Sequence, residues 1–327
     1  MQFVDGGIWT HNGRAHVESP SLLGFELTDG WPTHANVNGD WISVFFDGSG
    51  NAAWLNEQDF FDGSPRVAFE VPTGGPHHSG SATLIVNGQP FFAVAPRHPE
   101  GEILPTSVEV RDRDGNVVAT VPDCPRMHGN SSAGDVAVFG CVDGLVLVRP
   151  SGSSVEALKV TPEGEMEGLG LRNAWSATGA PFIIGQFSSP PGQQPSRRVL
   201  ALVDVSTGGL TPLPELPGGT IDHFRAVEPQ QGQAVLLGRD GTLYIFNGSG
   251  QLQRQVAGVV PTIPESGATT HQVSVVENLA AVASPSTGEV VLVNLASGQV
   301  DRRINVGGSP SRLAILGPRT DGLWEME

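Results

Sequence analysis

One pattern recurs along the chain and limits the folds open to it: a histidine placed just before an apolar run. His34, His78, His128, His223 and His271 occupy this place, at spacings of 44, 50, 95 and 48 residues. Because 95 is about twice the other intervals, we interpret the spacing as one structural unit per 44 to 50 residues, with one histidine skipped. Repeats of about 40 to 50 residues are typical of radially repeated β-sheets.

Aligned on these histidines, six stretches share one order of four short strands. A polar first strand is followed by an apolar second strand, a turn such as Asp-Gly or Asn-Gly, an apolar third strand and a fourth strand, which are strand and hairpin signals. Four-stranded units repeated around an axis form a β-propeller, whereas a sandwich would not explain the period. The units span residues 32–72, 76–122, 127–160, 172–215, 222–258 and 270–306.

Two fragments at each end of the chain stay outside the six units. They are Gln2–Trp9 and Leu22–Leu27 at the N-terminus, and Ser311–Leu316 and Gly322–Met326 at the C-terminus. Pairing strands from both ends would complete a seventh blade and leave no open sheet edge. We therefore expect an all-β fold, a seven-bladed propeller closed by its termini and forming a single domain over 1–327, with six blades as the fallback.

Charge and composition exclude several classes of partner. The 327 residues carry 34 acidic and 18 basic side chains, a net charge of -16, which would repel phosphate backbones. Nucleic acid is therefore not an expected partner. No apolar stretch approaches the length of a membrane helix, so we expect no membrane insertion, and we expect a monomer. The sequence Met1 to Asp5 does not resemble a signal peptide, so the protein is either cytoplasmic or has lost a leader.

In a propeller the first strands line the axis, so the five histidines should ring one mouth of the central channel. Imidazoles without thiolates favour zinc, although copper and nickel stay open, and zinc takes about four ligands. Further candidate ligands are His77 and, on an expected loop over residues 8–20 that could close as a flap, His11 and His16. The alternative is that each histidine belongs to a hydrogen-bonded network inside its own blade, as in WD40 repeats, although no Trp-Asp dipeptide is present.

Carboxylates near the expected mouth could bind the metal or orient an imidazole. Asp222 and Asp5 are the candidates for this role, while Asp47 is interpreted as a hairpin residue. His98 lies in a polar insertion and is expected on a surface loop.

Only two cysteines are present, Cys124 and Cys141, and no Cys-x-x-Cys motif occurs. They either form a disulfide, which would indicate an oxidising compartment, or are two buried thiols.

No motif of a nucleophilic, phosphate-binding or metalloprotease enzyme occurs, so we expect no enzyme. Two alternatives to a metal carrier stay open. One is a hydrolase or lyase whose metal activates water, with Asp222 or Glu18 as base. The other is a protein-interaction scaffold in which all histidines are structural.

Several segments together resemble a known family. They are PTH, VFFDGSGNA, PHH and CPRMHG followed by VAVFGCVDG, all within Pro32 to Gly144, and near the C-terminus THQVSVVENLAAVASPSTGEVVLVNL and VGGSPSRLAILG. These segments are similar to the bacterial zinc metallochaperones of the AztD type, which hand zinc to the solute-binding protein of an ABC importer.

The resemblance implies a periplasmic, seven-bladed propeller that binds zinc and releases it to that partner. It implies that His34, His78 and His128 are rim ligands and that His11 and His16 belong to a flap. It also implies that Cys124 and Cys141 are paired. We therefore expect a periplasmic or extracytoplasmic zinc carrier, with help from His77, His223 or His271.

Overall fold

The computed structural model describes residues 1–11, 14–219, 225–265 and 270–315. Its contacts divide the chain into two compact units, one of residues 1–29 with the chain end from Ala314 on, the other of Gly30–Leu313. Among the described residues the fold is all-β, with one short α-helix, α1 (Glu57–Phe61), and one 3-10 helix over Gly164–Met166. None of the described helices has the length and apolarity that a membrane crossing needs.

The larger unit contains six four-stranded antiparallel sheets, each built from four consecutive strands. The first three are β5 (Pro32–Asn38), β6 (Trp41–Phe46), β7 (Asn51–Asn56) and β8 (Phe69–Pro72); β9 (Ser81–Val86), β10 (Gln89–Val94), β11 (Val108–Arg111) and β12 (Val117–Val121); β13 (Asn130–Ala133), β14 (Val136–Cys141), β15 (Gly144–Ser151) and β16 (Ser154–Val160). The next three are β17 (Gly170–Trp175), β18 (Phe182–Ser188), β19 (Arg198–Asp204) and β20 (Leu210–Pro212); β21 (Arg225–Glu228), β22 (Gln233–Leu237), β23 (Leu243–Asn247) and β24 (Leu252–Val256); β25 (Val273–Val276), β26 (Leu279–Ser284), β27 (Glu289–Asn294) and β28 (Gln299–Asn305).

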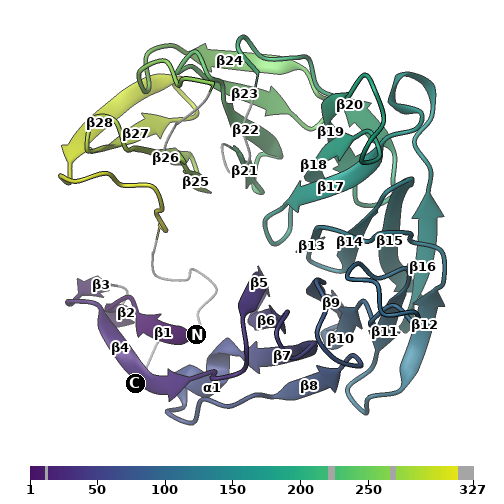
Figure 1. Cartoon of the computed structure of the whole chain (residues 1–327). Coiled ribbons are helices and arrows are strands. Elements are labelled where there is room, and N and C mark those ends of the chain that lie inside the picture. The colour runs from purple at the N-terminus through teal and green to yellow at the C-terminus, as the bar shows by residue number, and fades with distance from the viewer. Residues whose placement is uncertain (12–13, 220–224, 266–269, 316–327) are drawn as a thin grey trace. The chain divides into compact units, whose positions relative to one another are not determined.

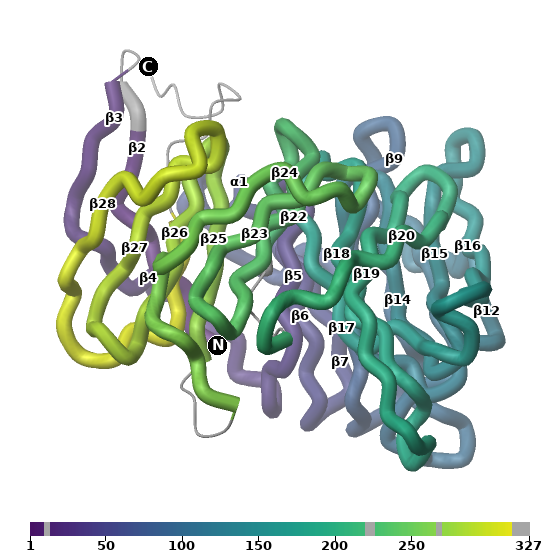
Figure 2. Tube along the Cα trace, turned by 90° about the horizontal axis from the view of Figure 1, so that it is seen from above, coloured from purple at the N-terminus to yellow at the C-terminus, as the bar shows by residue number. Residues whose placement is uncertain are grey.

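Each sheet of this unit has its first strand on the inside and its fourth strand on the outside (Figure 1). Figure 2 shows four of these sheets in reverse chain order from left to right, from β25–β28 through β21–β24 and β17–β20 to β13–β16. The predicted grouping into four-stranded units is thus confirmed, sheet by sheet.

Apolar side chains fill the spaces between neighbouring sheets, and the second strands are largely buried on both faces. Between the first two sheets Phe45, Trp54 and Phe92 are almost fully buried, and the rings of Trp54 and Phe92 lie 5.2 Å apart. The first strands differ from this pattern. Ser131 and Ser132 of β13 are buried although polar, which leaves hydroxyls rather than methyl groups near the axis.

The N-terminal unit contains two two-stranded sheets. One pairs β1 (Gln2–Asp5) with β4 (Ser21–Glu26), and the other pairs β2 (Ile8–His11) with β3 (Arg14–Val17). The segment expected as a loop over residues 8–20 is therefore largely a hairpin. The Asn-Gly pair at positions 12–13 of the sequence is a strong hairpin signal, and the role of this segment as a metal-capturing flap stays a prediction.

The C-terminal strand expected over Ser311–Leu316 does not form within the described residues 306–315. The backbone N–H of Leu313 donates to Gln272 Oε1 at 3.1 Å, and its carbonyl accepts from Ser274 Oγ at 3.4 Å. Side chains thus form the hydrogen bonds that a neighbouring strand would otherwise form with this backbone. The segment Gly322–Met326 lies outside the described residues. The seventh blade and its closure stay predictions.

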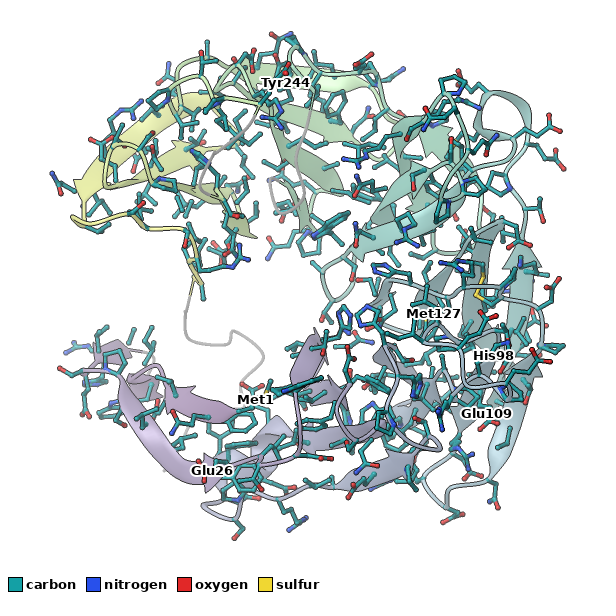
Figure 3. All side chains as sticks on the ribbon, viewed as in Figure 1. Met1, Glu26, His98, Glu109, Met127 and Tyr244 are labelled. Atoms are coloured by element: carbon teal, nitrogen blue, oxygen red, sulfur yellow. A yellow bond between two sulfur atoms is a disulfide. The ribbon has the colours of Figure 1, made fainter. Side chains whose placement is uncertain are left out.

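Cys124 and Cys141 form a disulfide, as the paired-cysteine interpretation predicted. It joins the connection between β12 and β13 to the end of β14, and both residues are buried. In Figure 3 the sulfur pair lies near the labelled Met127, on the same connection. The disulfide therefore fixes the segment that leads into β13.

Replacing both cysteines by alanine should lower the free energy of unfolding by about 3 kcal/mol, because the bridge closes a loop across a sequence separation of 17. Alanine suits the buried positions, since serine would add an unpaired hydroxyl. Urea denaturation followed by tryptophan fluorescence measures the difference. A loss below about 1 kcal/mol would contradict this role of the bridge.

Candidate metal centre

Three of the predicted histidines come together at one end of the first strands. The Nε2 atoms of His34 and His78 are 3.4 Å apart and their ring centroids 5.0 Å apart. The ring centroids of His78 and His128 are 5.1 Å apart. These imidazoles come from three consecutive sheets, so the structure brings together side chains that are 44 and 50 residues apart in the chain.

Asparagine side chains align the three strands that carry these histidines. Asn36 Nδ2 and Asn130 Nδ2 both donate to the carbonyl of Ser81, at 3.0 and 2.7 Å. Gly80 has no Cβ, and a Cβ there would overlap with Asn130 Oδ1. We call this arrangement the Ser81 lock. These hydrogen bonds fix the positions of β5, β9 and β13 along their length relative to one another.

The histidines stand at fixed offsets from the Ser81 lock. His34 and His128 each lie two residues before the locking asparagine, and His78 lies three residues before Ser81. The motif His-x-Asn in the first and third units is therefore a sequence signal for this site, in addition to the spacing of the histidines. It separates His34 and His128 from the other histidines of the repeat.

The Nδ1 atoms of two of the imidazoles have oxygen partners. His78 Nδ1 lies 2.7 Å from Asp47 Oδ2, and His128 Nδ1 lies 2.9 Å from the carbonyl of Arg172. In the neutral ring, Nδ1–H donates to such an oxygen and leaves the Nε2 lone pair free. Metal-binding histidines commonly have this kind of carboxylate or carbonyl partner.

The contact of Asp47 with His78 is one that the hairpin interpretation did not predict. Asp47 directly follows β6, whose Phe46 pairs with Pro32 at the beginning of β5, and so reaches the end of the strands where the histidines lie. Its other oxygen, Oδ1, is buried and has no hydrogen-bond partner among the described residues. A carboxylate with one buried, unpaired oxygen would favour a cation bound beside it.

Burial lowers the pKa of two of these imidazoles. Desolvation, followed by repulsion from His78, lowers the pKa of His34 from 6.5 to about 4, against the opposing effect of Asp47. Burial is also the largest cause of the lowered pKa of His128. Unprotonated imidazoles are the form that binds metals.

The spacing of His34 and His78 suits a shared ion. Two nitrogens that each lie about 2.05 Å from zinc at a tetrahedral angle are about 3.3 Å apart, and the observed Nε2 separation is 3.4 Å. The set is not fully assembled, however. Within the described ranges no three His, Cys, Asp or Glu side chains form a ready-made ligand group, so a shared ion would require rotation of at least one ring.

Two further predicted ligands, His77 and His271, are buried. His77 is 3% exposed, with Nδ1 2.8 Å from the Gly75 carbonyl and Nε2 3.2 Å from that of Ala95, and its role as a metal ligand stays a prediction. His271 is 4% exposed and lies just before β25. His223 and the carboxylate candidate Asp222 lie outside the described residues.

His11, His16, Asp5 and Glu18 belong to the N-terminal unit, which is described by itself. There the ring of His16 stacks on Trp9 at a centroid distance of 4.1 Å, and Asp5 accepts from the backbone of Gly7.

His98, labelled in Figure 3, accepts a hydrogen bond from the backbone of Glu100 within its own loop. This is the surface-loop position that the sequence predicts.

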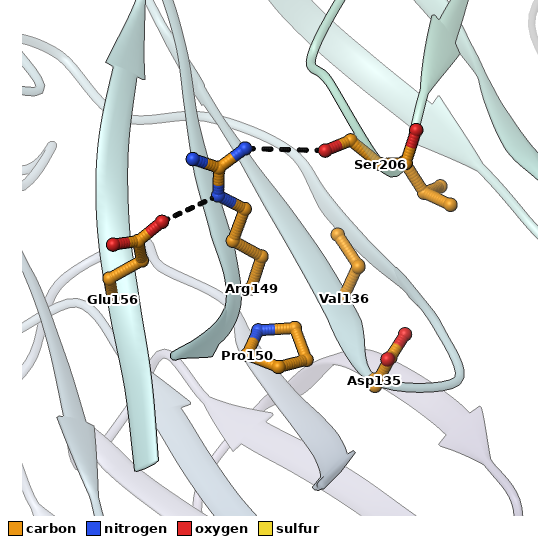
Figure 4. Close-up of a pocket in the computed structure, with 7 residues that line it drawn as sticks. Asp135, Val136, Arg149, Pro150, Glu156 and Ser206 are labelled. Atoms are coloured by element: carbon orange, nitrogen blue, oxygen red, sulfur yellow. Dashed lines mark hydrogen bonds and ion pairs between the residues drawn. The ribbon is translucent and has the colours of Figure 1, made fainter. Parts of the chain in front are cut away.

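A cavity of about 470 Å³ lies beside the turn that follows β13 (Figure 4). Its lining contains Asp135, Val205 and Arg149, and the Arg149 guanidinium donates to Glu156 and to the Ser206 carbonyl. No histidine lines it. This cavity therefore gives no support to the hydrolase alternative, which needs a substrate pocket beside the metal.

No family model matches the chain, and no curated protein matches it. Solved structures do match. Apo AztD from Citrobacter koseri superimposes with a TM-score of 0.78 at 21% identity, covering 95% of this chain and 81% of that one. A second crystal structure of Citrobacter koseri AztD gives 0.77 at 21% identity, covering 95% and 82%.

More distant propellers match as well. The β-propeller domain of Myceliophteria thermophila Cps50 (Swd1) gives a TM-score of 0.51 at 12% identity, covering 89% of this chain and 90% of that one. The dihydro-heme d1 dehydrogenase NirN gives 0.51 at 16% identity, covering 86% and 56%. These likenesses establish an AztD-type β-propeller fold, a fold shared with at least one enzyme.

The pKa of His34 predicts a pH dependence of stability. The unfolded side chain titrates near 6.5 and the folded one near 4, so between these values the unfolded state binds more protons. The free energy of unfolding should therefore fall as the pH drops from 6.5 to 4. Urea denaturation of metal-free protein should show a steeper loss in the wild type than in His34→Asn. Parallel pH profiles of the two proteins would contradict this assignment.

Proposed function

We propose that this propeller is a non-catalytic zinc carrier whose metal centre is formed by His34, His78 and His128. The observation that carries the proposal is the 3.4 Å separation of the His34 and His78 Nε2 atoms, with His78 held from behind by Asp47. The lowered pKa of His34 keeps its ring neutral at neutral pH. Zinc is favoured over copper and nickel by availability and by its preference for imidazole ligands at tetrahedral angles.

We further propose that the carrier delivers zinc to the solute-binding protein of an ABC importer, in the periplasm or another extracytoplasmic compartment. The sequence resemblance to zinc metallochaperones that serve such importers suggests this, and the similarity of the fold to Citrobacter koseri AztD supports it. The disulfide suits an oxidising compartment. A seventh blade made from both chain ends completes the proposal.

Release would proceed by ligand exchange, in which imidazoles of the acceptor replace those of the carrier one at a time. The side chains of His78 and Asp47 are 23% and 21% exposed, so an acceptor can reach them. A centre whose third ligand must rotate into place holds the metal less tightly than a preorganised one, which suits a protein that passes its metal on.

Zinc titration of the metal-free protein by calorimetry at pH 7 tests the binding step. Wild type should bind zinc at micromolar concentration or below. His34→Ala, His78→Ala and His128→Ala should each weaken binding more than about 100-fold, because loss of an outer partner of a ligand alone costs 10 to 100-fold. His98→Ala is the matched control and should bind as wild type. Absence of binding at micromolar zinc would defeat the proposal.

Asp47→Asn tests the role of the carboxylate. It should weaken zinc binding about 10 to 100-fold, because the amide neither attracts the cation nor holds the His78 ring as strongly. Asp114→Asn removes the same charge from an exposed turn and should leave the affinity unchanged. If both variants bind equally well, Asp47 has no part in the metal centre.

A further inference from the structure

Two large apolar side chains stand out on the surface of the Gly30–Leu313 unit. Trp31 is 79% exposed and Ile103 is 69% exposed, the highest values for large apolar side chains among the described residues of this unit. Single exposed apolar side chains are common on protein surfaces and need no explanation. These two have a further feature in common: the backbone of each is hydrogen-bonded to a residue of the candidate metal centre.

Trp31 is fixed to the segment that carries Asp47. Its carbonyl accepts from the backbone N–H of Asp47 at 3.0 Å, and the carboxylate of the same Asp47 contacts His78. The carbonyl of Gly30 accepts from the N–H of Gly48, also at 3.0 Å. A Cβ on Gly48 would lie 2.8 Å from that carbonyl oxygen, so glycine permits this close approach. The exposed indole therefore extends from a backbone that is held directly beside the centre.

The backbone conformation of Trp31 is strained. Its φ of 52° lies in the left-handed region, which bulky residues rarely adopt. Such a conformation costs free energy and persists only where the surrounding contacts determine it, most often at active sites and ligand-binding segments. Burial within this chain does little to offset the cost, because most of the side chain is exposed. The strain thus points to a contact with another molecule.

Ile103 lies on the loop that joins β10 to β11. Its carbonyl accepts from the backbone N–H of His78 at 3.0 Å. Two residues later, the carbonyl of Pro105 accepts at 2.8 Å from the N–H of Met127, the residue before His128. The loop is therefore held against the segments that carry two of the three histidines.

A short series of contacts joins the two apolar residues across the centre. It runs from the Trp31 carbonyl to the N–H of Asp47, from the Asp47 carboxylate to His78 Nδ1 at 2.7 Å, and from the His78 N–H to the Ile103 carbonyl. The side chain of His78 is itself 23% exposed. A protein that brings its own imidazoles to His78 would come within reach of both apolar side chains.

The charges beside Ile103 indicate which kind of surface fits. Glu100 and Glu102 lie on the same loop and are exposed. The guanidinium of Arg97 is directed to the carbonyl of Gly74, at 3.5 Å. The net charge of -16 opposes contact with a second copy of this chain or with an anionic membrane. A face with an apolar pocket for the indole and basic side chains around it would be complementary.

We propose that Trp31 and Ile103 form the apolar centre of a docking surface for the zinc acceptor, a protein whose matching face has an apolar pocket surrounded by basic side chains. This inference rests on the proposed function. Tryptophan is prominent among the residues that carry most of the binding energy of interfaces. Docking on segments that are hydrogen-bonded to Asp47 and His78 would place the ligands of the acceptor beside the partly exposed imidazole.

The test measures binding of the metal-free protein to the purified, metal-free solute-binding protein of the zinc importer from the same organism, by biolayer interferometry. W31A should weaken binding about 30-fold and I103A about fivefold, as expected for anchors of an interface. V37A removes an exposed apolar side chain near the other end of β5 and should bind as wild type. Equal affinities of W31A and wild type would overturn the docking surface, and so would absence of binding by wild type.

The charge of the partner face is tested separately. E100Q/E102Q should bind the solute-binding protein less tightly than wild type, and the difference should shrink at 0.5 M salt, since salt screens exposed charges (about 10 Å Debye length at 0.1 M). Unchanged affinity in this variant would overturn the basic face. Binding of wild type to phosphatidylglycerol vesicles, or a dimer of this chain that W31A abolishes, would assign the surface to another occupant and overturn the proposal.

Two measurements separate docking from the metal centre. W31A should bind zinc and release it to EDTA as wild type does, while its zinc transfer to the solute-binding protein at subsaturating concentration slows in proportion to the lost affinity. A tenfold loss of zinc affinity in W31A would overturn the docking role, because Trp31 would then support the centre itself. Docking is measured without metal, so a chain that docks but binds no zinc would refute the proposed zinc carrier and leave the docking surface standing.

Discussion

The geometry of the candidate centre depends on one carbonyl group. Ser81 O accepts from Asn36 and Asn130 at once, and this pair of hydrogen bonds fixes three first strands at the same level. Asn38 adds a second row of the same kind, donating to the carbonyls of Thr83 and Gly134. Since buried amides and carbonyls are costly when unpaired, the inner strands have little freedom to slide. This fixed register of the strands determines where the three histidines lie.

The repeat made the architecture predictable from the sequence. Hairpin turns and apolar second and third strands recur in every unit, so local signals alone place the strands in six sheets. The ends of the chain were harder, because they depend on side-chain contacts from distant residues. Leu313 has its backbone groups bound by Gln272 and Ser274, a pairing that no periodicity reports.

The centre was predictable only in part. Spacing identified His34, His78 and His128, but proximity in sequence also selected His77, whose two nitrogens face carbonyls of its own surroundings. Position in a repeat does not tell which way a ring turns. The contact of Asp47 with His78 was not predicted, because an Asp-Gly turn has a sufficient local explanation and the contact forms only when β5 and β6 are folded against each other.

Because the disulfide forms only under oxidising conditions, the structure around His128 depends on the compartment in which the chain folds. A chain folded in a reducing environment would keep Cys124 and Cys141 as buried thiols, and backbone hydrogen bonds from Met127 and His128 would then hold the segment without the covalent bridge. Samples from reducing and oxidising expression hosts would thus differ in the freedom of the His128 ring while sharing every residue. The host becomes a variable in any comparison of metal affinities between laboratories.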